Sequence, residues 1–160
     1  MEEAVANTNS EKAVRELVYR SCLLLDARNF AGFLDLCTDD FHYTISAYSP
    51  EVRKEMVWMD EGKQELKKML DVLPRHNSDN SPLSRHATVY TVDYSNDHKQ
   101  ASVVSALQVF RTSLDGGVTE LFGVGKLYDT ISLNGATPRL ASRNVRLETR
   151  MLGIGSHIPF

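Results

Sequence analysis

The chain is poor in the residues that mark several specialised classes of protein. Its 160 residues include two cysteines, five prolines and one tryptophan, which indicates neither a disulfide-stapled scaffold nor a proline-rich disordered chain. No apolar stretch approaches the roughly 20 residues that a membrane-spanning helix needs. The opening sequence MEEAVANTNSEKAVRE lacks the basic and apolar regions of a signal peptide. These absences predict a cytoplasmic protein that does not enter a membrane.

Charge of one sign is not in excess either. Lys and Arg number 18 and Asp and Glu 21, giving a formal net charge of −3. Such a balance offers no electrostatic attraction to nucleic acid or to an anionic membrane. Hydrophobic residues make up 42%, an ordinary value for a globular protein. The length predicts a single domain over residues 1–160, with residues 1–9 as a frayed tail.

The spacings that hold metal ions are missing. No HxH or HExxH pair occurs, so nothing predicts a metal site in this chain. The histidines stand singly, at His42, His76, His86, His98 and His157. Cys22 and Cys37 lie in apolar runs without a neighbouring His, which predicts reduced core thiols rather than nucleophiles. Gly123 and Gly125 lack the third glycine and the following helix of a phosphate loop.

What the first half does contain is helical periodicity. Thr8-Asn9-Ser10-Glu11 reads as a capping box, with Ser10 as the alternative cap, and an apolar stripe follows to about Asp26. Two further helices are predicted, from about Phe30 to Cys37 and from near Asp60 to Pro74. A strand is predicted from Phe41 to Tyr48, with an irregular stretch from Ser49 to Met59.

The second half reads as a meander of long strands. They are predicted at Ser84–Tyr94, Gln100–Thr112, Val118–Leu133 and Leu140–Leu152. Asp115-Gly116-Gly117 and Asn134-Gly135 are hairpin signals. Gly123 and Gly125 predict a bend or bulge in the strand that contains them. The expected fold is α+β, with three N-terminal helices on the concave face of a strongly curved antiparallel or mixed sheet. This order of elements resembles the cone-shaped NTF2-like and SnoaL-like fold.

Enzymes of that fold place a carboxylate, a His or a Tyr in the pocket of the cone, so two catalytic candidates arise. Asp39, near His42, could take part in general acid–base chemistry. His86 begins a strand and could point into the cone. The favoured interpretations are that Asp39 belongs to a helix-ending turn and that His86 faces solvent. The alternative is a stand-alone dehydratase or isomerase that uses His86 or Asp39, or a protein that binds a small ligand in the cone.

The final strand and the residues after it suggest a contact surface. Alternation places Val145, Leu147, Thr149 and Met151 towards the core and the charged side chains outward. Arg143, Arg146 and Arg150 could bind an anion, but salt bridges or an interface are favoured. The apolar end of the sequence should be covered by something. The predicted subunit-interface residues are Arg146, Glu148, Arg150, His157 and Phe160.

Five segments, taken in order, carry a family resemblance. They are LLDAR with FLDLCTDDFHY (24–28 and 33–43), PLSRH (82–86), SALQVFR (105–111), ELFGVGKLYD (120–129) and GSHIPF (155–160). They resemble the small (β) subunits of ring-hydroxylating Rieske oxygenases. Phe33 stands where that family commonly has Trp, and Leu127 precedes Tyr128 in a shifted form of its G-x-Y-x-D pattern. The branch, aromatic dioxygenase or sulfonate-oxidising monooxygenase, and thus the substrate, is left open.

The resemblance implies a structural subunit without catalytic residues, cofactor or metal of its own. A partner α subunit would carry a Rieske [2Fe–2S] cluster and a mononuclear Fe(II), supplied with electrons from NADH through a reductase. The β subunits would form a trimer within an α3β3 assembly. A Rieske cluster needs two Cys and two His, and the iron needs two His and a carboxylate. This sequence has neither pattern of spacing.

Overall fold

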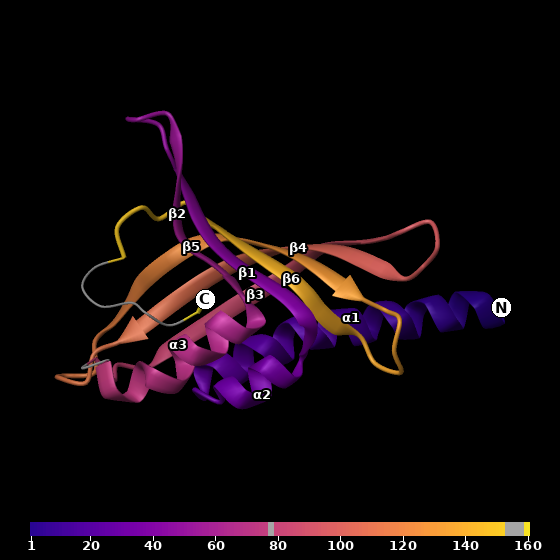
Figure 1. Cartoon of the computed structure of the whole chain (residues 1–160), viewed down its shortest axis with the longest axis horizontal. Coiled ribbons are helices and arrows are strands. Elements are labelled where there is room, and N and C mark those ends of the chain that lie inside the picture. The colour runs from indigo at the N-terminus through magenta and orange to yellow at the C-terminus, as the bar shows by residue number, and fades with distance from the viewer. Residues whose placement is uncertain (77–78, 153–158) are drawn as a thin grey trace.

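The computed structural model describes residues 1–76, 79–152 and 159–160. Its helices are α1 (Glu2–Asp26), α2 (Phe30–Asp35) and α3 (Lys63–His76). Its strands are β1 (Cys37–Ser49), β2 (Lys54–Gly62), β3 (Leu83–Tyr94), β4 (Gln100–Thr112), β5 (Thr119–Ser132) and β6 (Arg139–Leu147). Figure 1 shows the N-terminal end of α1 projecting beyond the sheet.

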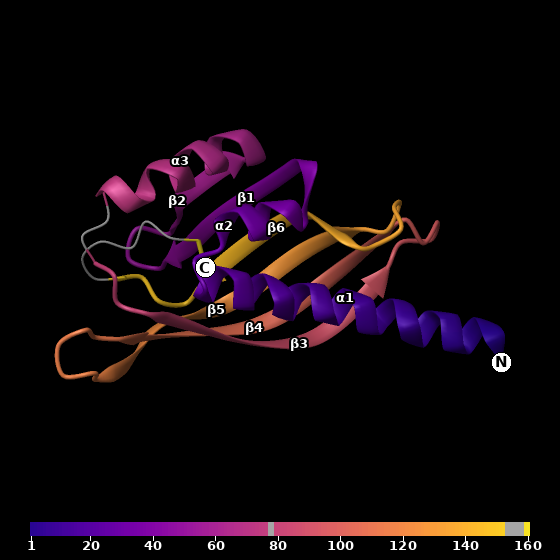
Figure 2. The same ribbon diagram turned by 90° about the horizontal axis from the view of Figure 1, so that it is seen from below.

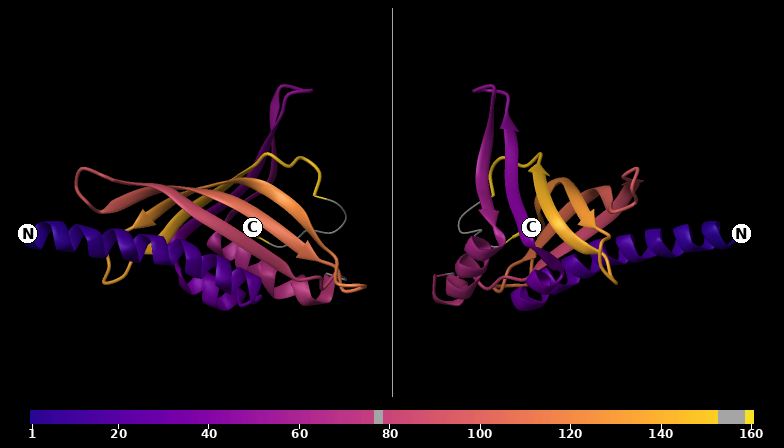
Figure 3. Two further views of the ribbon diagram at one scale, coloured as in Figure 1. Left: turned by 180° about the vertical axis from the view of Figure 1, so that it is seen from behind. Right: turned by 45° about the vertical axis from the view of Figure 1, so that its right-hand side comes forward.

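The strands form one six-stranded sheet in the order β2-β1-β6-β5-β4-β3. All neighbours are antiparallel except β1 and β6, which run parallel. The sheet arches over the helices, and α1, α2 and α3 cover one of its faces (Figures 2 and 3). The expected α+β architecture with a curved, mixed sheet is therefore confirmed.

The core lies between the helices and the sheet. The predicted stripe of α1 is buried, with Val14 and Val18 at 0% exposure. Facing it, β1 contributes Phe41, Tyr43 and Ile45, all of them buried. Asn29 caps α2 by accepting a hydrogen bond from the Gly32 backbone nitrogen at 2.9 Å. The apolar stripe predicted from the sequence is thus the face by which α1 packs on the sheet.

Curvature enters the sheet at β-bulges, as the glycines of β5 predicted. Val109 pairs with Gly123 but Phe110 pairs with Leu121, so Phe122 is the extra residue. A bulge of this kind bends its strand and increases the local twist. Gly125 serves a different purpose, because a Cβ there would lie 2.3 Å from the backbone oxygen of Arg146 in β6.

Several boundaries differ from the sequence prediction. Helix α3 continues through Pro74 to His76, and β1 begins at Cys37, so Asp39 lies in a strand and not in the predicted helix-ending turn. Helix α1 begins at Glu2 with Met1 as N-cap and no side-chain cap, so the predicted capping box at Thr8–Glu11 does not start the helix. Strand β2 occupies the stretch predicted as irregular. Strand β6 ends at Leu147, and Met151 is 87% exposed rather than in the core.

Candidate functional site

The two catalytic candidates lie apart and face solvent. His86 is exposed on β3, where its Nε2 lies 3.1 Å from the Ser84 hydroxyl and its ring packs edge-on against Phe110. Asp39 in β1 has a fully exposed side chain, 3.9 Å from the Lys63 amine. Strands β6, β5 and β4 separate β1 from β3 in the sheet. The structure therefore does not bring these residues together.

His42, the other histidine of that region, also lies at the surface. Its Nε2 contacts the Asp60 carboxylate of the neighbouring strand β2, and about half of each side chain is exposed. His42 sits opposite Gly62 in the β1–β2 pair. This contact joins two strands at the rim of the sheet and does not reach the interior of the cone.

The interior contains a fully buried ion pair instead. Arg143 of β6 donates from Nε and Nη2 to the two carboxylate oxygens of Asp129 in β5, both at 2.8 Å, and both side chains are 0% exposed. Burial by itself would lower the pKa of the Arg143 guanidinium, but the adjacent Asp129 carboxylate outweighs burial and leaves that pKa raised. Arg143 is therefore a structural cation of the core: it forms a salt bridge, as favoured from the sequence, but inside the subunit and not on an exposed strand face.

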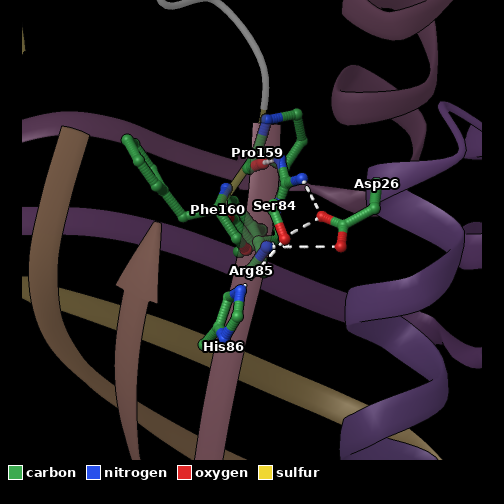
Figure 4. A network of polar contacts seen from close by, with 7 residues as sticks. Asp26, Ser84, Arg85, His86, Pro159 and Phe160 are labelled. Atoms are coloured by element: carbon green, nitrogen blue, oxygen red, sulfur yellow. Dashed lines mark hydrogen bonds and ion pairs between the residues drawn. The ribbon is translucent and has the colours of Figure 1, made fainter. Parts of the chain in front are cut away.

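A second buried arginine joins a helix, a strand and the end of the described chain. Arg85 of β3 donates from Nη1 to Asp26 of α1 at 2.8 Å and from Nη2 to the Pro159 carbonyl at 2.5 Å. Asp26 also accepts from the Arg85 backbone nitrogen at 3.1 and 3.2 Å. Figure 4 shows Arg85 lying between the Asp26 carboxylate and Pro159. Its side chain is only 1% exposed.

Phe160 lies inside its own subunit. Its side chain is 2% exposed and stacks on Phe122, with ring centroids 6.0 Å apart. The fully buried Tyr43 hydroxyl donates to the Phe160 carbonyl at 3.0 Å and accepts from the Phe160 nitrogen at 2.7 Å. Burial raises the pKa of the Tyr43 phenol. The expectation that Phe160 would be open to a neighbour is wrong, because its own core covers it. His157 falls outside the described residues.

The charged face of β6 lines a surface hollow of about 500 Å³. Arg146 and Arg150 are exposed, while Val145 and Leu147 are buried, so the predicted alternation holds within β6 but not as far as Met151. The hollow is lined by Tyr48, Pro50, Lys126, Tyr128, Arg146, Leu147, Glu148 and Arg150.

Two ion pairs tie this face to the β1–β2 hairpin. Arg146 Nη2 lies 3.5 Å from Glu55, and Arg150 contacts Glu51. The hydrogen bond from Arg150, together with those from the Glu51 backbone and Ser49, lowers the pKa of Glu51 to about 2. The hollow thus offers aromatic surface and both signs of charge.

The cysteines behave as predicted. Both are free and buried, and burial raises the pKa of the Cys22 thiol and raises that of Cys37 to about 12. A thiol with such a pKa is a poor nucleophile at neutral pH. Within the described residues no three His, Cys, Asp or Glu side chains gather as metal ligands. None of the helices in that part of the chain is long and apolar enough to cross a membrane.

Sequence reasoning did not identify the buried polar groups, although signals for them were present. Strand alternation sets Arg143 in phase with Val145 and Leu147, hence towards the core. Asp26, Arg85 and Asp129 each fall inside a segment that carries the family resemblance. A charged residue within such a motif, at a core-facing position, is the pattern that predicts a buried ion pair.

The comparisons with known proteins agree with that resemblance. The profile of the family described as "Ring hydroxylating beta subunit" matches residues 20–153. The chain is 42% identical, over 92% of its length and 85% of the relative's, to the methanesulfonate monooxygenase hydroxylase subunit beta of Methylosulfonomonas methylovora. It is 31% identical, over 92% of its length and 97% of the relative's, to the 2-aminobenzenesulfonate 2,3-dioxygenase subunit beta of an Alcaligenes species.

A solved structure supports the fold. The β subunit of a putative aromatic-ring-hydroxylating dioxygenase from Novosphingobium aromaticivorans superimposes with a TM-score of 0.79 at 23% identity. The match covers 98% of this chain and 99% of that one. The fold is NTF2-like, as the order of elements predicted.

Proposed function

The chain belongs to the family of ring-hydroxylating β subunits, and on this basis we propose that it is the non-catalytic small subunit of an oxygenase that acts on a sulfonate. The family match supports the role of a small subunit. The sulfonate is supported by the two curated relatives, one named for methanesulfonate and the other for 2-aminobenzenesulfonate. The identity to the methanesulfonate relative is higher, so a small sulfonate is the first substrate to test.

The absence of catalysis in this chain rests on the contents of the cone. The space that an NTF2-like enzyme would use for substrate holds Tyr43, Arg85, Arg143 and Phe160, all buried. The acid–base candidates, His86 and Asp39, lie on the outside. The stand-alone dehydratase or isomerase, and the small-ligand binder, are therefore not favoured.

The redox groups belong to the partner in this proposal. An α subunit would hold the Rieske [2Fe–2S] cluster and the mononuclear Fe(II), with electrons from NADH through a reductase. The described residues of this chain do not fit either group, because they bring no set of three candidate ligands together. This subunit would contribute a rigid base on which the α subunits assemble.

The contact surface we propose for that assembly is the hollow around β6. Arg146, Glu148 and Arg150 offer charge of both signs, and Tyr48 and Tyr128 are 50% and 40% exposed. Exposed aromatic and arginine side chains are enriched in protein interfaces. A trimer of β subunits within an α3β3 assembly is the expected stoichiometry.

The test is to purify the chain alone and together with its α subunit. Alone, it should self-associate, bind no iron by elemental analysis and oxidise nothing. With the α subunit, a reductase and NADH, the complex should oxidise methanesulfonate, with 2-aminobenzenesulfonate as the comparison substrate. Stoichiometric iron in the isolated chain, or activity without the α subunit, would contradict the proposal.

A further inference from the structure

A segment of the chain itself occupies the cone. Pro159 and Phe160 are both buried, although β6 ends at Leu147. Phe160 belongs to the same core cluster as α1 and β1. These two residues therefore lie in the core beside Arg85 (Figure 4), in the space between the helices and the sheet.

The polar contacts to these residues go to backbone atoms. Arg85 donates to the Pro159 carbonyl at 2.5 Å, and Tyr43 donates to the Phe160 carbonyl at 3.0 Å and accepts from the Phe160 nitrogen at 2.7 Å. Any dipeptide carries these carbonyls. Arg85 Nε is buried without a hydrogen-bond partner among the described residues, which leaves the site one donor to spare.

The contacting groups are held in place by the rest of the fold. Asp26 fixes Arg85 through the 2.8 Å contact to Nη1 and through its backbone nitrogen. Tyr43 lies on β1, which is paired on both sides, and packs against Phe41, with ring centroids 6.2 Å apart. These contacts to Asp26 and Phe41 do not involve Pro159 or Phe160.

A slot in β5 receives the aromatic ring. The Phe160 ring stacks on Phe122, the bulged residue, with 20° between the ring planes. At Gly123 a Cβ would lie 3.4 Å from Phe160 Cε1, an ordinary contact distance, so the ring packs beside the β5 backbone at this position. The slot selects a flat side chain, while the polar contacts select a peptide backbone.

We propose that this part of the cone is a binding site for a short aromatic peptide, and that Pro159–Phe160 fills it as an intramolecular ligand. The ligand class is a peptide with an aromatic side chain and two carbonyl acceptors, one for Arg85 and one for Tyr43. The inference concerns this chain alone, so it stands or falls without the α subunit.

The experiment removes the internal ligand and adds it back. A chain that lacks Pro159 and Phe160 is titrated with N-acetyl-Pro-Phe-amide, a neutral peptide whose binding reports the ring and the backbone contacts. Truncation should lower the melting temperature by about 10 °C, because a core aromatic is lost. Millimolar peptide should restore part of that loss, since a ligand that binds only the folded state stabilises it. Calorimetry should show one saturable site.

Matched controls separate the contacts. N-acetyl-Pro-Ala-amide lacks the ring and should not bind. The full chain, whose site is filled, should bind neither peptide. Tyr43→Phe in the truncated chain should weaken the aromatic peptide about tenfold, because the peptide loses its hydroxyl partner.

A truncated chain that does not fold alone is refolded with and without the peptide. Recovery of native circular dichroism only with the aromatic peptide supports the proposal. Either a folded truncated chain without saturable binding, or an unfolded one that the peptide does not rescue, overturns it. Equal binding of the Ala peptide would also overturn the assignment of the ring slot.

Discussion

At the scale of single residues, the pair of Arg143 and Asp129 has the most demanding environment in the described structure. Both side chains are completely buried, so each ion has lost its water and depends on the other. Arg143 Nη1 has no hydrogen-bond partner among the described residues, so the pair is not fully satisfied. Breaking such a pair costs more than replacing both members, because one charge is left without compensation.

Asp129→Asn is therefore expected to lower the free energy of unfolding by about 3–5 kcal/mol. The double variant Asp129→Leu with Arg143→Met should recover most of this loss, since it removes both charges and keeps similar volume. Urea denaturation followed by circular dichroism measures both. A loss of less than about 1 kcal/mol in the single variant would show that the buried charge finds another partner.

At the scale of elements, the curvature of the sheet depends on two glycines with different roles. Gly123 adjoins the bulge in β5 and faces Phe160 at ordinary contact distance. Gly125 pairs with Leu147 of β6, and a Cβ there would lie 2.9 Å from the Leu147 Cα. Flexible side chains can move aside, but a strand backbone held on both sides cannot.

Gly125→Ala is expected to cost about 3 kcal/mol or more, because β5 and β6 must separate to admit the methyl group. Gly123→Ala is the matched control and should cost less than about 1 kcal/mol, since its methyl would sit in ordinary contact. Thermal melting of the two variants makes the comparison. Equal melting temperatures would mean that the sheet accommodates the methyl group without separating β5 from β6.

Sequence periodicity correctly predicted the strands in which apolar residues alternate with polar ones because one face is buried. The bounds of β4 were predicted to the residue, and those of β3 and β5 to within one, because their alternating residues pack on the core. Strand β2 was missed because it is an edge strand with no fully buried residue. Only its pairing with β1 defines it, and a pairing between strands leaves no mark in local periodicity.

The same reasoning explains what the sequence showed of the candidate site. The outward face of β6 followed from alternation, so Arg146 and Arg150 were placed correctly. The position of Phe160 did not follow, because its partners Tyr43 and Phe122 lie far away in the chain. An apolar end of the sequence predicts that something covers it, but not whether the cover is a neighbour or the chain's own core.

At the scale of the whole molecule, the hollow around β6 joins the sheet to the β1–β2 hairpin by ion pairs. Arg146 and Glu55 remain 51% and 37% exposed, so their contact contributes little to folding. Side chains that stabilise the subunit so little are free to serve an assembly. Their proposed role can be separated from the intrachain pair by exchanging the charges.

Arg146→Glu is expected to weaken self-association while changing the free energy of unfolding by no more than about 1 kcal/mol. The exchange variant Arg146→Glu with Glu55→Arg restores the intrachain pair and should remain weak in assembly, because a neighbour would still meet the wrong charge. Sedimentation and thermal melting measure the two effects. If the exchange variant assembled as well as the unchanged protein, Arg146 would act only through its ion pair with Glu55 and not through a contact with a neighbouring subunit.

The parallel pairing of β1 with β6 has a consequence for how the chain folds. Thr44 lies beside Asn144, so two segments far apart in the sequence meet within the sheet. Contacts this distant slow folding, because a large loop must close before they form. On the ribosome, β1 emerges long before its partner strand has been made. Until then its open edge can pair with other chains, which makes this nascent protein a natural client for chaperones.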